Sequence, residues 1–448
     1  MKKPKILLLS DDMRLSSGVS TMSKELVLGL TKDFDIVQLG AALNHPEIGK
    51  VIDLSDDMNK TLKIENSYVK IYPVSGYGDI QTIRFLLDTE KPDAILHFTD
   101  PHYWQWLYEN EHEIRQRVPI LYYHVWDNNP TPLYNKNYYE SCDGIFCISK
   151  LTYGNVINGI KNVKNKPYVS YVQHGVNVNV FKPLKKIDPD FHKTIHGDKK
   201  YDFILFYNNR NIRRKQTSDV ILSYKMFCDK LPKKESEKCL LLMHTKPIDE
   251  NGTNLFSVVN ALCPNYDVKF TNEHFSQDGL NQLYNIADCT INIANNEGFG
   301  ITTVESLAAG TPIIVNVTGG LQDQCGFNVD NVELTADDYV KIETLSDKPS
   351  YATPGLWAKA IFPASRSLNG SIHTPYIFED RVNLNDVAKN ISFMYKTGEK
   401  NRNKIGLLGR EYVKKTLSSE IMCEKMKNNI NYCLLNFKNK KSYELIKI

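Results

Sequence analysis

Two glutamates and a glycine-rich loop stand close together in the second half of the chain. Glu297 begins the loop EGFG, and Glu305 lies about one turn inside the helical pattern that follows at residues 301–309. A helix entered through glycines directs unpaired backbone N–H groups and a positive dipole end toward its start, where a phosphate binds well. Carboxylates instead accept hydrogen bonds from hydroxyl groups. Together these residues suit a ligand that carries phosphates between two polyhydroxylated groups, as a nucleotide sugar does.

The same residues also allow a purely structural interpretation. Thr302-x-x-Glu305 fits a capping box, in which Glu305 only closes the start of the helix. Gly298 and Gly300 could serve only a tight turn. Such short patterns arise often by chance, so this segment alone does not decide between the two interpretations.

A cluster of cations follows the expected strand at residues 201–207. Four of the six residues at 210–215 are cations, namely Arg210, Arg213, Arg214 and Lys215. Cations buried without partners are costly, so these side chains are either solvated or face anions. An arginine offers a planar fork and a lysine a point charge, and the two together can offset two phosphate charges.

Two histidines fall at the carboxyl ends of expected parallel strands in the first half of the chain. His97 lies in ILHFTD and His124 in YYHVWDNNP. Ligands of such sheets lie beyond these strand ends, so we expect both side chains to run into a cleft and to hydrogen-bond a sugar or an acceptor hydroxyl. The alternative, that each is a satisfied polar residue near a core, stays open. Asp127 and Asn128 follow closely and are expected to bind the acceptor or to handle protons.

Strands that alternate with helices must position these groups. The alternation along both halves of the chain predicts an α/β fold with doubly wound parallel sheets. A chain of 448 residues suits two domains of about 200 residues each. A polar, lysine-rich stretch at residues 182–200 is typical of an interdomain linker. The expected strands lie at residues 5–10, 36–39, 69–73, 94–98, 120–124 and 144–148 in the first half, and at 201–207, 239–244, 268–270, 289–294 and 313–317 in the second.

Composition disfavours several classes of protein. No apolar run approaches the roughly 18–20 residues of a membrane span, so we expect no transmembrane segment and a cytoplasmic protein. The nine cysteines are scattered without a CxxC pair, which indicates neither a zinc site nor a disulfide framework. Residues 396–448 carry 13 Lys and Arg against 5 Asp and Glu. This basic segment is expected to be a solvated face; the alternative is a surface for membrane lipid or nucleic acid.

Several motifs together resemble those of one enzyme family. Glu297 to Glu305 forms E-x7-E with an internal GFG and a following AxGTPII, and Arg210 with Lys215 forms R-x4-K. Residues 174–183 (HGVNVNVFKP) resemble the element (N/H)GV(D/N)xxxFxP. These motifs are similar to those of GT4, a large family of retaining glycosyltransferases. The resemblance implies a GT-B architecture, in which two Rossmann-like doubly wound domains face each other across a cleft.

The resemblance also implies roles for the motif residues. Arg210 and Lys215 would contact the donor pyrophosphate. Glu305 would hold the ribose hydroxyls and Glu297 the transferred sugar, and His124 resembles a catalytic-site histidine of the family. Neither a metal ion nor a cofactor is expected. The expected catalytic residues are His124, Glu297, Arg210 and Lys215; the expected donor-binding residues are Gly18, Arg210, Lys215, Glu297, Gly298, Phe299, Gly300, Ile301, Thr302 and Glu305; the expected acceptor-side residues are His97, Asp127 and Asn128.

The implied organisation has three parts. An acceptor-side domain is expected at residues 1–190, a nucleotide-sugar-binding domain at 191–404, and C-terminal helices that cross back to the first domain at 405–448. The nucleotide base is expected near residues 269–272.

The C-terminal part of the second domain shows no pattern of the family. Residues 347–376 are rich in Pro, Ser and Gly and are expected to form a long surface excursion. In that excursion Trp357, Phe362 and Arg366 are expected to shape an acceptor surface. A helix is expected to run from residue 405 to residue 436.

The function implied by the resemblance is transfer of a sugar, with retention of configuration, from a nucleotide-diphosphate sugar to a hydroxyl acceptor. We expect a UDP-sugar such as UDP-glucose as the donor and a saccharide or a lipid-linked molecule as the acceptor, with peripheral membrane contact left open. Three alternatives stay open: glycosylation of hydroxymethylated bases in DNA, a non-catalytic sugar-nucleotide-binding protein, and an epimerase of the same fold.

Overall fold

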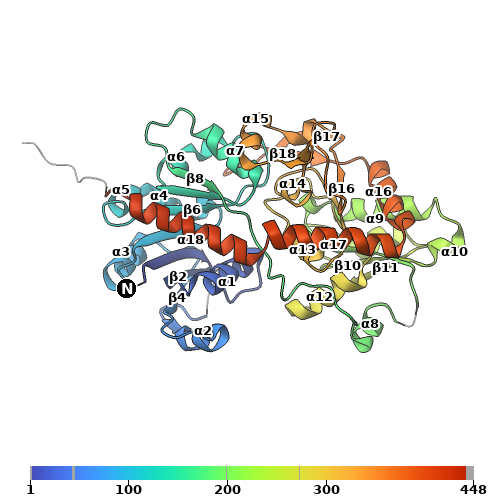
Figure 1. The fold of residues 1–448 in the computed structure, drawn as a ribbon, viewed down its shortest axis with the longest axis horizontal. Coiled ribbons are helices and arrows are strands. Elements are labelled where there is room, and N and C mark those ends of the chain that lie inside the picture. Colours follow the sequence, from blue (N-terminus) through green and yellow to red (C-terminus); the bar gives the residue numbers. More distant parts are fainter. Residues whose placement is uncertain (1–2, 43–45, 198, 272, 440–448) are drawn as a thin grey trace, which may run out of the picture.

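The N-terminal half is built around a mostly parallel sheet (Figure 1). The computed structural model describes residues 3–42, 46–197, 199–271 and 273–439, and eight strands in this part of the chain join in the order β3-β4-β2-β1-β5-β6-β7-β8. The order reverses at β1, which pairs with β2 on one side and β5 on the other. Ligands of such sheets bind beside a reversal of this kind. The strands are β1 Lys5–Asp11, β2 Asp35–Ala42, β3 Ile52–Asp53, β4 Val69–Ser75, β5 Ala94–Phe98, β6 Ile120–His124, β7 Gly144–Cys147 and β8 Tyr168–Tyr171.

The second half repeats this arrangement. Six strands within the described ranges form a parallel sheet in the order β11-β10-β9-β12-β13-β16, with its reversal between β9 and β12. The structure thus confirms the predicted fold class, two Rossmann-like doubly wound domains. The strands are β9 Phe203–Asn208, β10 Cys239–His244, β11 Asp267–Thr271, β12 Cys289–Asn292, β13 Ile313–Asn316 and β16 Ala358–Ile361.

Helices cover the sheets and explain the composition of the strands. The central strands are continuous apolar runs because both of their faces are buried, as in β10, where Cys239 to Met243 are all fully buried. Among the residues placed by the structure, no helix combines the length and the hydropathy needed to cross a bilayer. The helices are α1 Gly18–Leu30, α2 Ser55–Leu62, α3 Ile80–Thr89, α4 Gln105–Glu109, α5 Glu111–Ile114, α6 Lys136–Glu140, α7 Lys150–Gly159, α8 Pro189–His196, α9 Thr217–Cys228, α10 Lys233–Ser236, α11 Leu255–Leu262, α12 Gln277–Ile286, α13 Ile301–Ala308, α14 Leu321–Gln324, α15 Ala336–Ile342, α16 Leu384–Thr397, α17 Glu399–Thr416 and α18 Ser419–Asn436.

The last two helices run end to end across both halves of the molecule (Figure 1). α17 packs on α13 in the second half, and α18 packs on α1 and β7 in the first. The prediction of one helix over residues 405–436 is wrong, because the helix breaks at Leu417 and Ser418 caps a new one by accepting a hydrogen bond from the amide of Ile421. At this break the amide of Val176 donates to the carbonyl of Leu417 at 3.0 Å, which joins the crossing point to the segment after β8. Residues 440–448 lie outside the described part of the chain.

The close packing of α17 on the loop after α13 depends on Gly406. A Cβ atom at this position would overlap the carbonyl oxygen of Gly310. We expect Gly406→Ala to lower the free energy of unfolding by about 1–3 kcal/mol, because overpacking forces the two segments apart. Urea unfolding measures the change, with Asn403→Ala as the control, since Asn403 is exposed on the same helix. Equal midpoints for the two variants would contradict the expected clash.

Residues 347–376, expected from the sequence as a long surface excursion, contain two strands, and residues 365–376 are mostly exposed. The segment supplies β16 to the second sheet and β17 (Ser365–Asn369) to a two-stranded antiparallel hairpin with β18 (Ile377–Arg381). Trp357 does not shape a surface, because its ring stacks on Tyr412 at 4.8 Å and its indole N–H donates to the carbonyl of Gln324 at 2.9 Å. β16 and β17 have only four and five residues, and Pro363 lies between them. Strands this short give no alternation of polar and apolar residues that the sequence would reveal.

Candidate functional site

The glycine loop enters α13 without a side-chain cap. Gly300 is the N-cap residue, and its φ of 83° lies in the left-handed region that favours glycine. The capping-box interpretation is therefore excluded, because Glu305 does not reach back to the helix start. Its carboxylate accepts a hydrogen bond from the Tyr284 hydroxyl at 2.7 Å, and that hydroxyl accepts one from the side-chain amide of Asn208 at 2.8 Å. The first-turn N–H groups of α13 therefore receive no side-chain cap at the positive end of the helix.

An ion cluster lies beside this helix start. Lys215 forms a buried ion pair with Glu297. Arg214 lies 3.8 Å from Glu297 and 3.7 Å from Asp127, and it donates to the carbonyl of Asn296 at 2.8 Å. Burial alone would raise the pKa of Glu297, but the charges of Lys215 and Arg214 outweigh that effect and hold the pKa below its usual value. The carboxylate therefore stays ionised between two cations.

The loop after β9 explains why Arg214 and not Arg210 joins the cluster. The carbonyl of Arg214 accepts a hydrogen bond from the amide of Asn295 at 2.8 Å, which ties the cation loop to the glycine loop. Arg210 lies outside the cluster; its side chain is 63% exposed and pairs with Asp249 at 3.0 Å. The R-x4-K spacing pointed to Arg210, whereas the run of four cations was the signal that could have drawn attention to Arg214.

Both predicted cleft histidines are in the core. The ring nitrogens of His124 bond to the hydroxyls of Tyr122 and Tyr139, each at 2.9 Å, and burial lowers the pKa of His124 to about 3. His97 is also fully buried, with one nitrogen 2.6 Å from the hydroxyl of Tyr108. The prediction that these side chains run into the cleft is wrong, because neighbouring tyrosines satisfy them inside the first domain.

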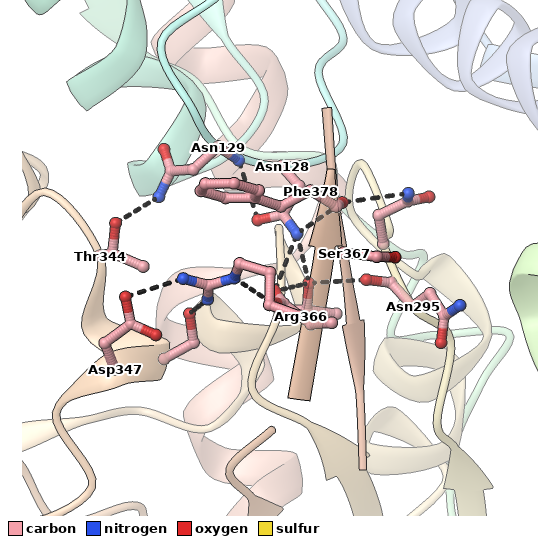
Figure 2. Close-up of polar contacts among 12 residues, drawn as sticks. Asn128, Asn129, Asn295, Thr344, Asp347, Arg366, Ser367 and Phe378 are labelled. Carbon is pink, nitrogen blue, oxygen red and sulfur yellow. Dashed lines mark hydrogen bonds and ion pairs between the residues drawn. The ribbon is translucent and has the colours of Figure 1, made fainter. Parts of the chain in front are cut away.

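Asp127 and Asn128 lie where the two halves meet, but they differ in what they contact. Asp127 is pressed against the glycine loop: a Cβ atom on Gly298 would lie 2.9 Å from its carboxylate. Asn128 is 1% exposed and donates to Asp380 at 2.8 Å and to Thr318 at 3.1 Å (Figure 2). The expectation that Asn128 faces an acceptor is therefore wrong; its amide fastens the first domain to the second.

Other predicted donor residues differ in their surroundings. The side chain of Phe299 is buried edge-on against His174, with ring centroids 5.3 Å apart, so only its backbone can face a ligand. Gly18 opens α1, and no atom lies within 4 Å of the place where its Cβ would be. Burial raises the pKa of Glu305 to about 7 against the hydrogen bond from Tyr284, which lowers it, and the charge of Glu25 on α1 adds a smaller upward effect.

Two cavities flank these residues. One of about 720 Å³ is lined by Lys269, Phe270 and Thr271 at the end of β11, the stretch expected to hold the base; Asn272 of that stretch lies outside the described residues. A second cavity, of about 350 Å³, lies at the domain interface. Its lining includes Asp100, His102, Trp126, Asp127, Arg214, Thr374 and Ile377. His102, which the sequence did not single out, lines this interface cavity.

Comparisons with known proteins agree with the observed fold. Residues 188–347 match the sequence model of the family described as glycosyl transferases group 1. Comparison with curated proteins finds no match. Similar solved structures include a glycosyltransferase from Rickettsia africae ESF-5 and the sucrose-phosphate synthase of Thermosynechococcus elongatus, each with a TM-score of 0.66, 15% identity, and coverage of 97% of this chain and 100% of the other. Anabaena Alr3699/HepE in complex with UDP-glucose matches with a TM-score of 0.60 and 12% identity over 96% of this chain and 99% of that one. The protein has the GT-B fold, and its second domain carries the sequence signature of the group 1 glycosyltransferases.

Proposed function

We propose that this protein is a retaining, metal-independent glycosyltransferase that moves a hexosyl group from a nucleotide-diphosphate sugar to a hydroxyl acceptor, with UDP-glucose as the expected donor. The observation that carries the proposal is the placement of Lys215 and Arg214 against Glu297, beside the uncapped start of α13. In the chain this helix start lies between Glu297 and Glu305. The structure of Anabaena HepE with UDP-glucose and that of the E. coli trehalose-6-phosphate protein with UDP-2-fluoro glucose support this choice of donor.

The chemistry of donor cleavage follows from the charges. The donor diphosphate lies over the start of α13, where Lys215, Arg214 and the first-turn amides oppose its charge. Arg214 here takes the part that the sequence pattern assigned to Arg210. Two fixed cations and a helix end offset the charge that develops on the leaving diphosphate, so the step does not depend on a metal ion.

Transfer then exchanges one bond for another at the anomeric carbon. The bond from this carbon to the diphosphate oxygen breaks, and the acceptor hydroxyl oxygen attacks from the same face. The acceptor proton passes to the departing phosphate oxygen, which balances the charge. Glu305 holds the ribose hydroxyls and Glu297 a hydroxyl of the transferred sugar. Because Glu305 is occupied by ribose, the two glutamates do not act as the carboxylate pair of a glycoside hydrolase.

An isotope-labelled donor screen tests this function. The protein is incubated with UDP-, GDP- and ADP-sugars, first alone and then with saccharides or hydroxymethylated DNA. We expect slow release of UDP from UDP-glucose, acceleration by one class of acceptor, no loss of rate in EDTA, and an α-linked product by NMR. Binding without turnover would favour the non-catalytic alternative, and absence of binding to every nucleotide sugar would contradict the proposal.

A further inference from the structure

The β17–β18 hairpin extends from the second domain and is anchored there by a buried carboxylate. Asp380 is fully buried and accepts hydrogen bonds from Arg366 at 2.5 Å and from Thr318 at 2.8 Å. The backbone amide of Asp380 donates to the carbonyl of Asn295 at 2.8 Å, and Asn295 lies just before the glycine loop (Figure 2). A carboxylate satisfied in this way holds the base of the hairpin in one place.

The far end of the hairpin rests on the first domain. The Tyr376 hydroxyl donates to the carbonyl of Thr131 at 3.1 Å, and the Tyr134 hydroxyl donates to the carbonyl of Tyr376 at 2.8 Å. The ring of His373 stacks on that of His102, with centroids 4.9 Å apart and planes 9° from parallel. The hairpin therefore bridges the two domains over the end of the first sheet.

The interface cavity of about 350 Å³ lies under this bridge. Thr374 and Ile377 form the wall on the hairpin side, and Asp100, His102 and Trp126 form the opposite wall. Its volume is at the small end of the range for ligand pockets, roughly 300–1,000 Å³. One ring fits such a space better than the middle of a long chain does.

The charges in the cavity are unbalanced toward the negative. Asp100 and Asp127 supply two carboxylates, and the one lining cation, Arg214, also lies 3.8 Å from Glu297. Burial, and then the charge of Asp127, raise the pKa of Asp100 to about 6, so the Asp100 carboxylate is ionised above that pH. Carboxylates accept hydrogen bonds from hydroxyls, and an indole such as that of Trp126 packs against a sugar face, whereas a phosphate would meet like charges.

We propose that the β17–β18 hairpin completes an acceptor subsite that selects a neutral, hydroxyl-bearing ring, such as an unphosphorylated sugar, over a phosphorylated one. This inference rests on the proposed glycosyl transfer and names its acceptor class. The unbalanced carboxylates carry the preference, which we expect to be about tenfold or more in initial rate.

Matched pairs of acceptors test the preference for a neutral ring. UDP release from UDP-glucose is measured with glucose, fructose and mannose and with the 6-phosphate of each. We expect faster release with the neutral member of at least one pair, and a smaller ratio in Asp100→Asn. UDP release that is accelerated equally by the neutral and the phosphorylated member of each pair, or more by the phosphorylated member, overturns the proposal.

Two hairpin variants test the role of the bridge. Thr374→Trp fills the cavity, whereas Ile372→Trp places the same side chain two residues away, where Ile372 is 92% exposed. We expect Thr374→Trp to lower acceptor-dependent release at least tenfold with unchanged calorimetric UDP binding, and Ile372→Trp to behave as the unaltered protein. Equal rates in the two variants overturn the assignment of the cavity. Failure of the proposed function itself is distinguishable, since the unaltered protein would then bind no nucleotide sugar, or would bind one without releasing UDP with any acceptor.

Discussion

Replacing Lys215 by Met lowers kcat/KM for the nucleotide sugar by about 10²–10³-fold, the usual cost of removing one fixed group that stabilises developing charge. Lys215 is 7% exposed and lies against Glu297 at the start of α13. In so enclosed a place no water replaces the lost ammonium group when the diphosphate departs. Steady-state kinetics with labelled donor measures the loss, and Lys225→Met is the control, because Lys225 lies on α9 in a partly exposed pair with Asp229.

The stability of this variant needs a separate check. Removing one partner of a buried ion pair leaves the other charge uncompensated, which costs about 3–5 kcal/mol. The double variant Lys215→Met/Glu297→Gln removes both charges and should regain most of the lost unfolding free energy in urea. It should not regain the rate. Recovery of kcat/KM in the double variant would mean that Lys215 serves only to neutralise Glu297.

The sequence was sufficient for the fold and for the glycine loop because both depend on local signals. Continuous apolar strands separated by helices predict doubly wound sheets, and the structure confirms them. The loop at residues 297–300 is likewise local, since its glycines and the helix start that follows are adjacent in the chain. These signals require no knowledge of what the segments contact.

Contacts distant in the sequence were beyond such reasoning. His124 was expected in a cleft because of its place at a strand end. The hydroxyl of Tyr139, fifteen residues later in the chain, instead hydrogen-bonds its ring inside the core. Asn128 is fastened by Asp380, which lies 252 positions away, and nothing near Asn128 in the chain reveals that partner. Arg214 is chosen over Arg210 by a backbone bond to Asn295. Each outcome was decided by tertiary pairing.

The pH dependence of donor binding should report on Glu305. Its pKa is raised to about 7 by burial, and ribose hydroxyls donate to the ionised form. We therefore expect the affinity for UDP to rise with pH up to about 7 and to level off above it, and Glu305→Gln to remove this dependence and to weaken binding about 10–100-fold at pH 8. Tyr284→Phe removes a hydrogen bond that lowers the pKa, so it should move the midpoint to higher pH. Calorimetric titration of UDP at several pH values measures all three.

Stability should change in the opposite direction, which separates a binding role from a structural one. The usual pKa of a glutamate is 4.5, so between pH 4.5 and about 7 the folded protein holds a proton on Glu305 that the unfolded chain has lost. Rising pH therefore favours unfolding across this window, by an amount on the order of 3 kcal/mol when the window is complete. Glu305→Gln should escape this loss and be more stable than the unaltered protein at pH 8, but not at pH 4.5. A group whose role is to bind the ligand can destabilise the protein without it, so its replacement should raise the free energy of unfolding at pH 8. A variant that loses both stability and UDP affinity at pH 8 would show instead that Glu305 supports the fold.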